Sequence, residues 1–163
     1  MPCGGREGYH FDVGRLAPLR WAMASPLIDL TPLRKALAML REALAFWNAQ
    51  PDGAPLKPHL RSAVIQSFEF TYELSVRLLR RVLIERVESA DRVVNLSFND
   101  LLRSGADAGL LAAPDRWREW REMRNATTHA YDETTAQAVA ARAAVFVEDA
   151  AALLSALEVN LAK

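Results

Sequence analysis

The chain has 163 residues, of which 51% are hydrophobic and 25% are charged, a balance typical of an ordinary globular domain. Its 20 lysines and arginines equal its 20 aspartates and glutamates in number. This zero net charge excludes a global positive field that would attract nucleic acid or anionic lipid, so any phosphate chemistry requires a local site. No apolar run approaches the roughly 18 residues that span a bilayer, and the one cysteine excludes an internal disulfide, so we expect a cytoplasmic protein.

Residues 1–26 differ from the rest of the chain because they combine glycines and scattered charges without sustained periodicity. We therefore predict a poorly ordered N-terminal tail over 1–26 and one helical domain over 27–163. The tail has no basic segment followed by an apolar one, so we expect no signal peptide. Met23 shortly precedes the patterned region, which leaves Met1 and Met23 as alternative start sites.

Apolar residues recur at intervals of three and four from residue 30 onward, the spacing that lines one face of a helix. The pattern predicts helices over 30–47, 59–88, 97–108, from 114 onward and over 134–161. Trp117 and Trp120, three residues apart in the fourth helix, suit core packing first and base stacking second. No alternating, strand-like segment occurs, so we predict an all-α fold, an up-down bundle of about five helices.

Three helix ends carry recognisable capping residues. Thr31 is predicted to cap the first helix, with Pro32 at its first position. Gly109 suits the left-handed conformation that ends the third helix. The hydroxyl of Thr134 and the amide of Gln137 predict a capping box at the start of the last helix.

The sequence contains no glycine-rich phosphate loop, no Cys/His metal spacing and no serine nucleophile elbow, which leaves one candidate segment, at the end of the fourth helix. It reads Arg124-Asn125-Ala126-Thr127-Thr128-His129-Ala130-Tyr131. An arginine binds phosphate through a planar fork of donors, and a histidine exchanges protons near neutral pH. RNA supplies its own nucleophile, the 2′-OH, so this set suits metal-independent cleavage. A helix C-terminus also favours arginine and histidine through its dipole, so residue chemistry alone leaves both explanations open.

The local geometry of this segment adds a further expectation. Asn125 and His129 are four residues apart and therefore share one face of a helix. Thr127 and Thr128 favour fraying or turning at this point. A loosened helix end is expected to let Arg124 and His129 converge on a common point.

The segment matches the Arg-x4-His-x-Tyr motif, with a polar residue directly after the arginine, and thereby resembles the HEPN proteins. These are small all-helical proteins, many of them metal-independent endoribonucleases. The stretch Arg-Ser-Ala-Val-Ile-Gln-Ser-Phe-Glu-Phe-Thr-Tyr-Glu-Leu, residues 61–74, is similar to the signature of the HEPN subgroup called nucleotidyltransferase substrate-binding proteins. HepT toxins, which pair with a minimal nucleotidyltransferase antitoxin of the MntA type, are closely similar. The resemblance covers residues 30–161.

The resemblance implies a role for each matching residue. Arg124 binds and polarises the scissile phosphate, His129 acts as general acid and base, and Asn125 orients the site. The site of the family lies in a cleft across the twofold axis of a homodimer, which implies a homodimer acting on RNA. In HepT-type systems the MntA-like partner uses ATP to attach AMP to the tyrosine that matches Tyr131, which implies that AMP on Tyr131 silences the nuclease. The chain itself is expected to need no cofactor and no metal.

Four further charged residues are candidates for the cleft or for a partner surface. Glu69, Glu73 and Arg77 follow one another at four-residue spacing, a pattern that also suits a solvated stripe of salt bridges. Arg121 lies one turn before the motif and, with neighbouring arginines, could extend a basic lip for RNA. The glutamates beside it equally suit a solvated helix face.

The sequence thus supports one function hypothesis and leaves an alternative from another class. The first is a HepT-like toxin, a dimeric and metal-independent RNA endonuclease that uses Arg124 and His129. The alternative is a non-catalytic subunit that presents substrate to a separate nucleotidyltransferase. A structural helical module with a decayed site is disfavoured by the complete Arg/Asn/His/Tyr set.

Overall fold

The computed structural model describes residues 28–86 and 95–162. Its elements in chain order are α1 (Thr31–Ala49), α2 (Lys57–Glu85), α4 (Phe98–Asp107), α5 (Pro114–Ala126), the 3-10 turn η1 (Thr127–His129) and α6 (Glu133–Leu161). The prediction of an all-α bundle of about five helices is therefore confirmed for the described part of the chain. The predicted tail over 1–26 and the choice between Met1 and Met23 lie outside the described residues.

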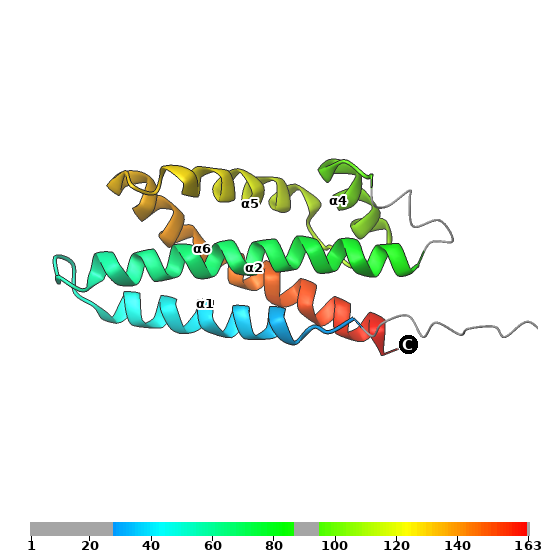
Figure 1. Ribbon diagram of the computed structural model, residues 1–163, viewed down its shortest axis with the longest axis horizontal. Coiled ribbons are helices and arrows are strands. Elements are labelled where there is room, and N and C mark those ends of the chain that lie inside the picture. Colours follow the sequence, from blue (N-terminus) through cyan, green and yellow to red (C-terminus); the bar gives the residue numbers. More distant parts are fainter. Residues whose placement is uncertain (1–27, 87–94, 163) are drawn as a thin grey trace, which may run out of the picture.

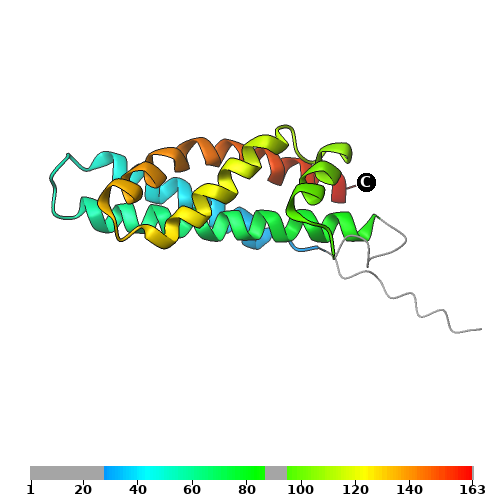
Figure 2. The same ribbon diagram turned by 90° about the horizontal axis from the view of Figure 1, so that it is seen from above.

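Three long helices, α1, α2 and α6, form the body of the bundle by packing against one another. Figure 1 shows α2 lying between α1 and α5, with α4 beside the C-terminal end of α2. Seen from above in Figure 2, the α1–α2 connection and the α5–α6 junction both lie at one end of the bundle, and α4 lies at the other end. The C-terminal end of α5, which carries the candidate motif, therefore lies at the end away from α4.

The apolar stripes predicted from the sequence are the faces that the helices bury. Leu33, Leu37 and Leu40 of α1 are at most 2% exposed, where α1 packs against α2 and α6. Trp117 and Trp120 of α5 are 2% and 1% exposed, which confirms core packing for both. Full burial of such side chains contributes roughly 1.5–3 kcal/mol each. None of the helices within the described ranges combines the length and apolar character needed to cross a membrane.

A cluster of aromatic rings joins α2, α5 and α6. Its centre is Phe146 of α6, which is completely buried. The Phe146 ring centroid lies 4.9 Å from that of Phe68 and 5.6 Å from that of Trp120, with the rings edge to face. Trp117 and Tyr72 complete the cluster, with centroids 6.0 and 6.5 Å from Phe146. The cluster therefore fixes how α2 and α5, the helices that carry the candidate residues, sit on α6.

The ends of the first helices agree only in part with the predictions. The Thr31 hydroxyl does not cap α1; instead the backbone N–H of Thr31 donates to Asp29 Oδ1 at 2.9 Å. α2 begins earlier than predicted, at Lys57, because Pro58 fits the first turn, where its missing N–H needs no acceptor. Gly109 has a φ of 70° after α4, which confirms its predicted left-handed conformation.

The predicted capping box at the start of α6 is wrong. α6 begins at Glu133, one residue before Thr134, and its N-cap residue is Asp132. The backbone N–H of Thr135 donates to Asp132 Oδ2 at 2.8 Å. A carboxylate accepts this bond more strongly than a hydroxyl does and also favours the positive end of the helix dipole. Gln137 instead lies near Arg61 of α2, whose guanidinium donates to its side-chain oxygen at 3.3 Å.

The α6 cap has a pH-dependent effect on stability. Hydrogen bonds from Thr135 hold the pKa of Asp132 below its ordinary value of 3.8. A carboxyl with a lowered folded-state pKa stabilises the fold above its unfolded pKa and loses this contribution as the pH falls through the folded value. Asp132→Asn keeps an acceptor oxygen but does not titrate. In thermal unfolding, the unsubstituted chain should lose more stability than the variant when the pH is lowered from about 5 to below 3.8. Equal losses would contradict this assignment.

Candidate functional site

The candidate motif lies where α5 ends and the chain turns toward α6. The α-helical pattern stops at Ala126, and the next three residues form the 3-10 turn η1. The hydroxyls of Thr127 and Thr128 reach back to the carbonyl oxygens of Arg124 and Asn125, at 2.6 and 2.8 Å. These hydroxyls supply side-chain donors to carbonyl oxygens in the last turn of α5. The predicted turn at these two threonines is therefore confirmed.

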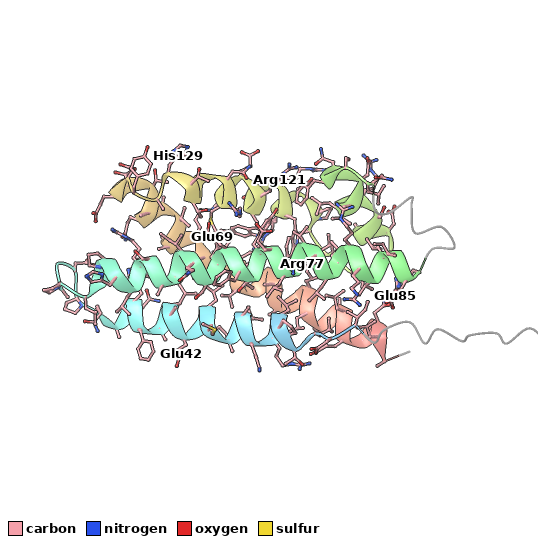
Figure 3. All side chains as sticks on the ribbon, viewed as in Figure 1. Glu42, Glu69, Arg77, Glu85, Arg121 and His129 are labelled. Atoms are coloured by element: carbon pink, nitrogen blue, oxygen red, sulfur yellow. The ribbon has the colours of Figure 1, made fainter. Side chains whose placement is uncertain are left out.

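Arg124 is directed toward two carboxylates of α2. Its Nε donates to Glu73 Oε1 at 2.9 Å, and its Nη1 lies 3.9 Å from Glu69 Oε1. The Arg124 side chain retains 32% of its exposure, so solvent and ligands can still reach the guanidinium. Figure 3 shows Glu69 on the side of α2 that faces α5. Two of the predicted cleft residues are thus brought together with the predicted phosphate-binding residue.

Glu69 also holds the turn that follows α5. The Thr127 hydroxyl lies 2.5 Å from Glu69 Oε1 and 2.6 Å from the Arg124 carbonyl oxygen, so its one proton is shared between two acceptors. Thr127 is 8% exposed, and the low local dielectric strengthens such a bond. Glu69 therefore links Arg124 and η1 to α2, a role for Thr127 that the sequence pattern did not indicate.

His129 lies on the opposite side of this helix end from the α2 carboxylates. Figure 3 shows it on the outer side of the bundle. Its ring meets that of Tyr131 edge to face, with centroids 6.0 Å apart. Tyr131 is 87% exposed, and both His129 and Asn125 are exposed as well. Within one copy of the chain, Arg124 thus faces α2 while His129 and Tyr131 face solvent, so the expected convergence does not occur inside the single chain.

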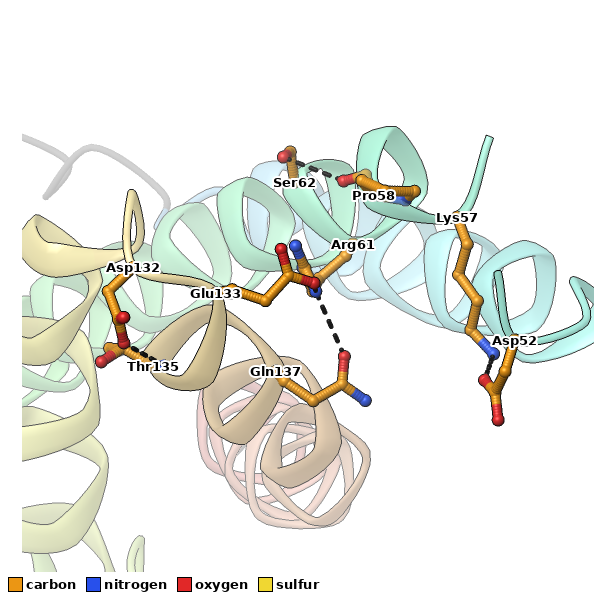
Figure 4. Close-up of polar contacts among 9 residues, drawn as sticks. All are labelled: Asp52, Lys57, Pro58, Arg61, Ser62, Asp132, Glu133, Thr135 and Gln137. Atoms are coloured by element: carbon orange, nitrogen blue, oxygen red, sulfur yellow. Dashed lines mark hydrogen bonds and ion pairs between the residues drawn. The ribbon is translucent and has the colours of Figure 1, made fainter. Parts of the chain in front are cut away.

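An ion pair between Arg61 and Glu133 ties the exit of the motif to α2. Arg61 Nη1 donates to Glu133 Oε1 at 2.8 Å, and Figure 4 shows the pair with Gln137 beside it. The Arg61 side chain is 12% exposed, and its guanidinium lowers the pKa of Glu133. Sequence reasoning missed this contact because 72 residues separate the partners. The sequence offered one hint, which is that Arg61 is the first residue of the 61–74 stretch and Glu133 closely follows the 124–131 motif.

The two remaining candidates lie apart from the Arg124 contacts. Arg77 is exposed and lies four residues after Glu73; Figure 3 shows it on α2. Arg121 is exposed on α5, and its guanidinium carbon lies 4.6 Å from the centroid of the Phe98 ring in α4. Burial raises the pKa of the Tyr72 phenol to about 12, and the positive charge of Arg121 opposes that rise.

Comparison with known proteins identifies the family. The sequence profile of the family described as "nucleotidyltransferase substrate binding protein like" matches residues 28–159, most of the chain. The chain belongs to this family. The resemblance stated from the two sequence stretches is therefore confirmed.

A curated protein and a solved structure, both from Haemophilus influenzae, are similar to this chain. A curated protein named "probable ribonuclease HepT" is 37% identical over 98 residues, which cover 60% of this chain and 67% of the relative. A solved structure, reported to reveal the fold of a substrate binding domain of a nucleotidyltransferase, matches with a TM-score of 0.73 and 31% identity. That match covers 80% of this chain and 99% of the solved one. The all-helical bundle is thus the fold expected of a family member.

Proposed function

We propose that this HepT-like chain is the RNA endonuclease of a toxin–antitoxin pair, controlled by a minimal nucleotidyltransferase of the MntA type. The observation that carries the proposal is the complete set of Arg124, Asn125, His129 and Tyr131 at an exposed helix end. The ribonuclease name of the 37% identical relative supports it. The description of the family supports a nucleotidyltransferase as partner.

The proposed reaction uses the 2′-OH of RNA as nucleophile. The 2′-oxygen attacks the adjacent phosphorus while a neutral His129 imidazole takes its proton, and the bond from phosphorus to the 5′-oxygen breaks. A protonated imidazole gives the leaving 5′-oxygen its proton, which leaves a 2′,3′-cyclic phosphate and a 5′-hydroxyl. Arg124 stabilises the charge that grows on the non-bridging oxygens, and its fork of donors fits two of them. Asn125 orients the bound strand.

A second copy of the chain is needed to complete this site. In one copy Arg124 faces Glu69 and Glu73 while His129 faces solvent on the other side of the helix end. A twofold pairing of two exposed helix ends would place two Arg124/His129 sets around one cleft. A phosphate entering that cleft would compete with the α2 carboxylates for the guanidinium, which is accessible enough for such an exchange.

The partner would control the nuclease through Tyr131. The phenol is 87% exposed, which suits a modified residue, and its ring lies against His129. Attack of the phenol oxygen on the α-phosphorus of ATP, with loss of the phenol proton and release of pyrophosphate, would attach AMP there. It would place a phosphate charge and a nucleoside over the general acid/base. The added phosphate would also compete with RNA for the Arg124 guanidinium. Modification of Tyr131 would thus block the cleft without altering the fold.

A second candidate function is a non-catalytic subunit that presents substrate to a separate nucleotidyltransferase. It is favoured by the description of the 31% identical solved structure as a substrate binding domain. This function requires a stable complex with the nucleotidyltransferase and loss of nucleotide transfer when the chain is absent. RNA cleavage by the chain alone is not expected from it.

RNA cleavage by the purified full chain, free of partner and of nucleotide, tests the proposal. The chain should cut single-stranded RNA, and His129→Ala should reduce the rate by at least about a hundredfold because general acid–base catalysis is lost. His59→Ala, which removes another exposed histidine outside the motif, should leave the rate unchanged. Circular dichroism checks that both variants stay folded. No cleavage by the unsubstituted chain, or full cleavage by His129→Ala, would overturn the proposal.

A further inference from the structure

A shallow groove beside the motif separates α5 from the start of α4. It has a volume of about 300 Å³, and its lining comes from Phe98 and Asn99 of α4 and from Arg118, Arg121, Glu122 and Asn125 of α5. Asn125 belongs to both the groove and the candidate motif. The groove therefore continues from the motif along α5 toward α4.

The side chains of Phe98 and Arg121 pack against each other in this groove. The Arg121 guanidinium carbon lies 4.6 Å from the Phe98 ring centroid, which places a planar cation over the ring. Phe98 is partly buried and packs against the core, so the lower member of the pair is anchored. Arg121 is exposed, so the outer side of the pair faces solvent. A nucleobase stacks on a guanidinium plane as it does on an aromatic ring.

The charge of Arg121 remains available to a ligand. Among residues 28–86 and 95–162, no carboxylate lies within ion-pair distance of its guanidinium. Arg118, in contrast, pairs with Asp115, and its Nε donates to the side-chain oxygen of Asn99 at 3.1 Å. That bond uses the Asn99 oxygen, so its amide nitrogen can donate to a base edge. Within the described part of the chain, Glu122 is the one carboxylate that lines the groove, and it opposes the approach of a phosphate more than that of a neutral base.

We infer that this groove binds a nucleobase of single-stranded RNA, with Arg121 and Phe98 as the stacking platform. The inference rests on the proposed function, because it assigns the groove to the nucleotide next to the scissile bond. The base stacks on the outer face of the Arg121 guanidinium, and the amides of Asn99 and Asn125 reach its edge. Stacking accepts every base, so the platform sets the position of the strand more than its sequence.

Fluorescence of 2-aminopurine, which falls when the base stacks, tests the inference. The probe is a short single-stranded oligoribonucleotide carrying one 2-aminopurine, moved along the strand in a series. The full chain carrying His129→Ala binds it without cutting. Fluorescence should fall at one or two adjacent positions, and Arg121→Lys, which keeps the charge but removes the plane, should abolish this and weaken binding about tenfold. Arg103→Lys, an exposed arginine of α4 outside the groove lining, serves as the matched control and should change nothing.

A second variant and the unsubstituted chain separate the groove assignment from the proposed function. Phe98→Leu should reproduce the Arg121→Lys result if the ring holds the guanidinium in place, and circular dichroism checks its fold. The inference would be overturned if Arg121→Lys left both the quenching and the affinity unchanged. It would also be overturned if Arg121→Lys weakened binding but the His129→Ala chain without this substitution quenched the probe at no position. An unsubstituted chain that quenches the probe but cuts no RNA would overturn the proposed function and leave the groove assignment standing.

Discussion

Arg124→Lys should reduce the rate of RNA cleavage by roughly a hundredfold while leaving the fold intact. Lysine keeps the positive charge but loses the planar fork that donates to two phosphate oxygens at once. Removal of one well-placed donor to a developing oxyanion costs about 10²–10³ in rate. Steady-state cleavage of a fluorescent oligoribonucleotide measures the loss, which should fall mainly on kcat.

The free energy of unfolding distinguishes phosphate binding by Arg124 from a purely structural role in the ion pair with the α2 carboxylates. Arg124, Glu69 and Glu73 are all at least 32% exposed, and exposed ion pairs contribute only about 0–1 kcal/mol. Arg124→Lys should therefore unfold within about 1 kcal/mol of the unsubstituted chain. Glu73→Gln serves as the matched control because it removes the partner of the same ion pair but no proposed donor to phosphate. Unreduced cleavage by Arg124→Lys would contradict the role of the planar guanidinium in binding the phosphate.

Phe146→Ala should destabilise the folded chain by about 3–5 kcal/mol. The ring is completely buried, and four other aromatic rings surround it with centroids between 4.9 and 6.5 Å away. Truncation removes edge-to-face contacts and leaves a cavity that the rigid helices α2, α5 and α6 cannot close. Denaturant unfolding measures the free energy, and the melting temperature should fall by roughly 10 °C.

Val145 offers a control for this substitution on the same helix. It precedes Phe146 but is 47% exposed, so Val145→Ala should change the free energy of unfolding by less than about 0.5 kcal/mol. A loss below about 1 kcal/mol for Phe146→Ala would contradict the central position of this ring in the core. Because the ring joins α2 and α5, the variant should also lose cleavage activity at temperatures where it remains folded.

The fold could be predicted from the sequence because its determinants are local and periodic. The stripe of Leu33, Leu37 and Leu40 needs only helical spacing to be recognised, and it is buried as predicted. Helical spacing does not identify the residue that caps α6. Both Asp132 and Thr134 are good capping residues, and the choice depends on which backbone N–H each oxygen reaches.

The candidate site was predictable in its composition but not in its contacts. The spacing from Arg124 to Tyr131 is readable in the chain, and the turn at Thr127 follows from local hydroxyl chemistry. The pairing of Arg124 with Glu73 spans 51 residues and depends on how α2 packs beside α5. Helical periodicity carries no information about such partners. The contact of Arg121 with Phe98 escaped prediction for the same reason.

Complementation between two inactive variants examines whether Arg124 and His129 act together across two copies. Chains carrying Arg124→Ala and chains carrying His129→Ala are each assayed alone and then refolded together in equal amounts. In an equal mixture, half of the dimers contain one chain of each variant. If each site combines Arg124 of one copy with His129 of the other, one of the two sites in such a mixed dimer has both residues intact. The mixture should then regain about a quarter of the unsubstituted activity. Activity of the mixture no greater than the sum of the separate variants, with both variants shown to pair, would contradict a site shared between copies.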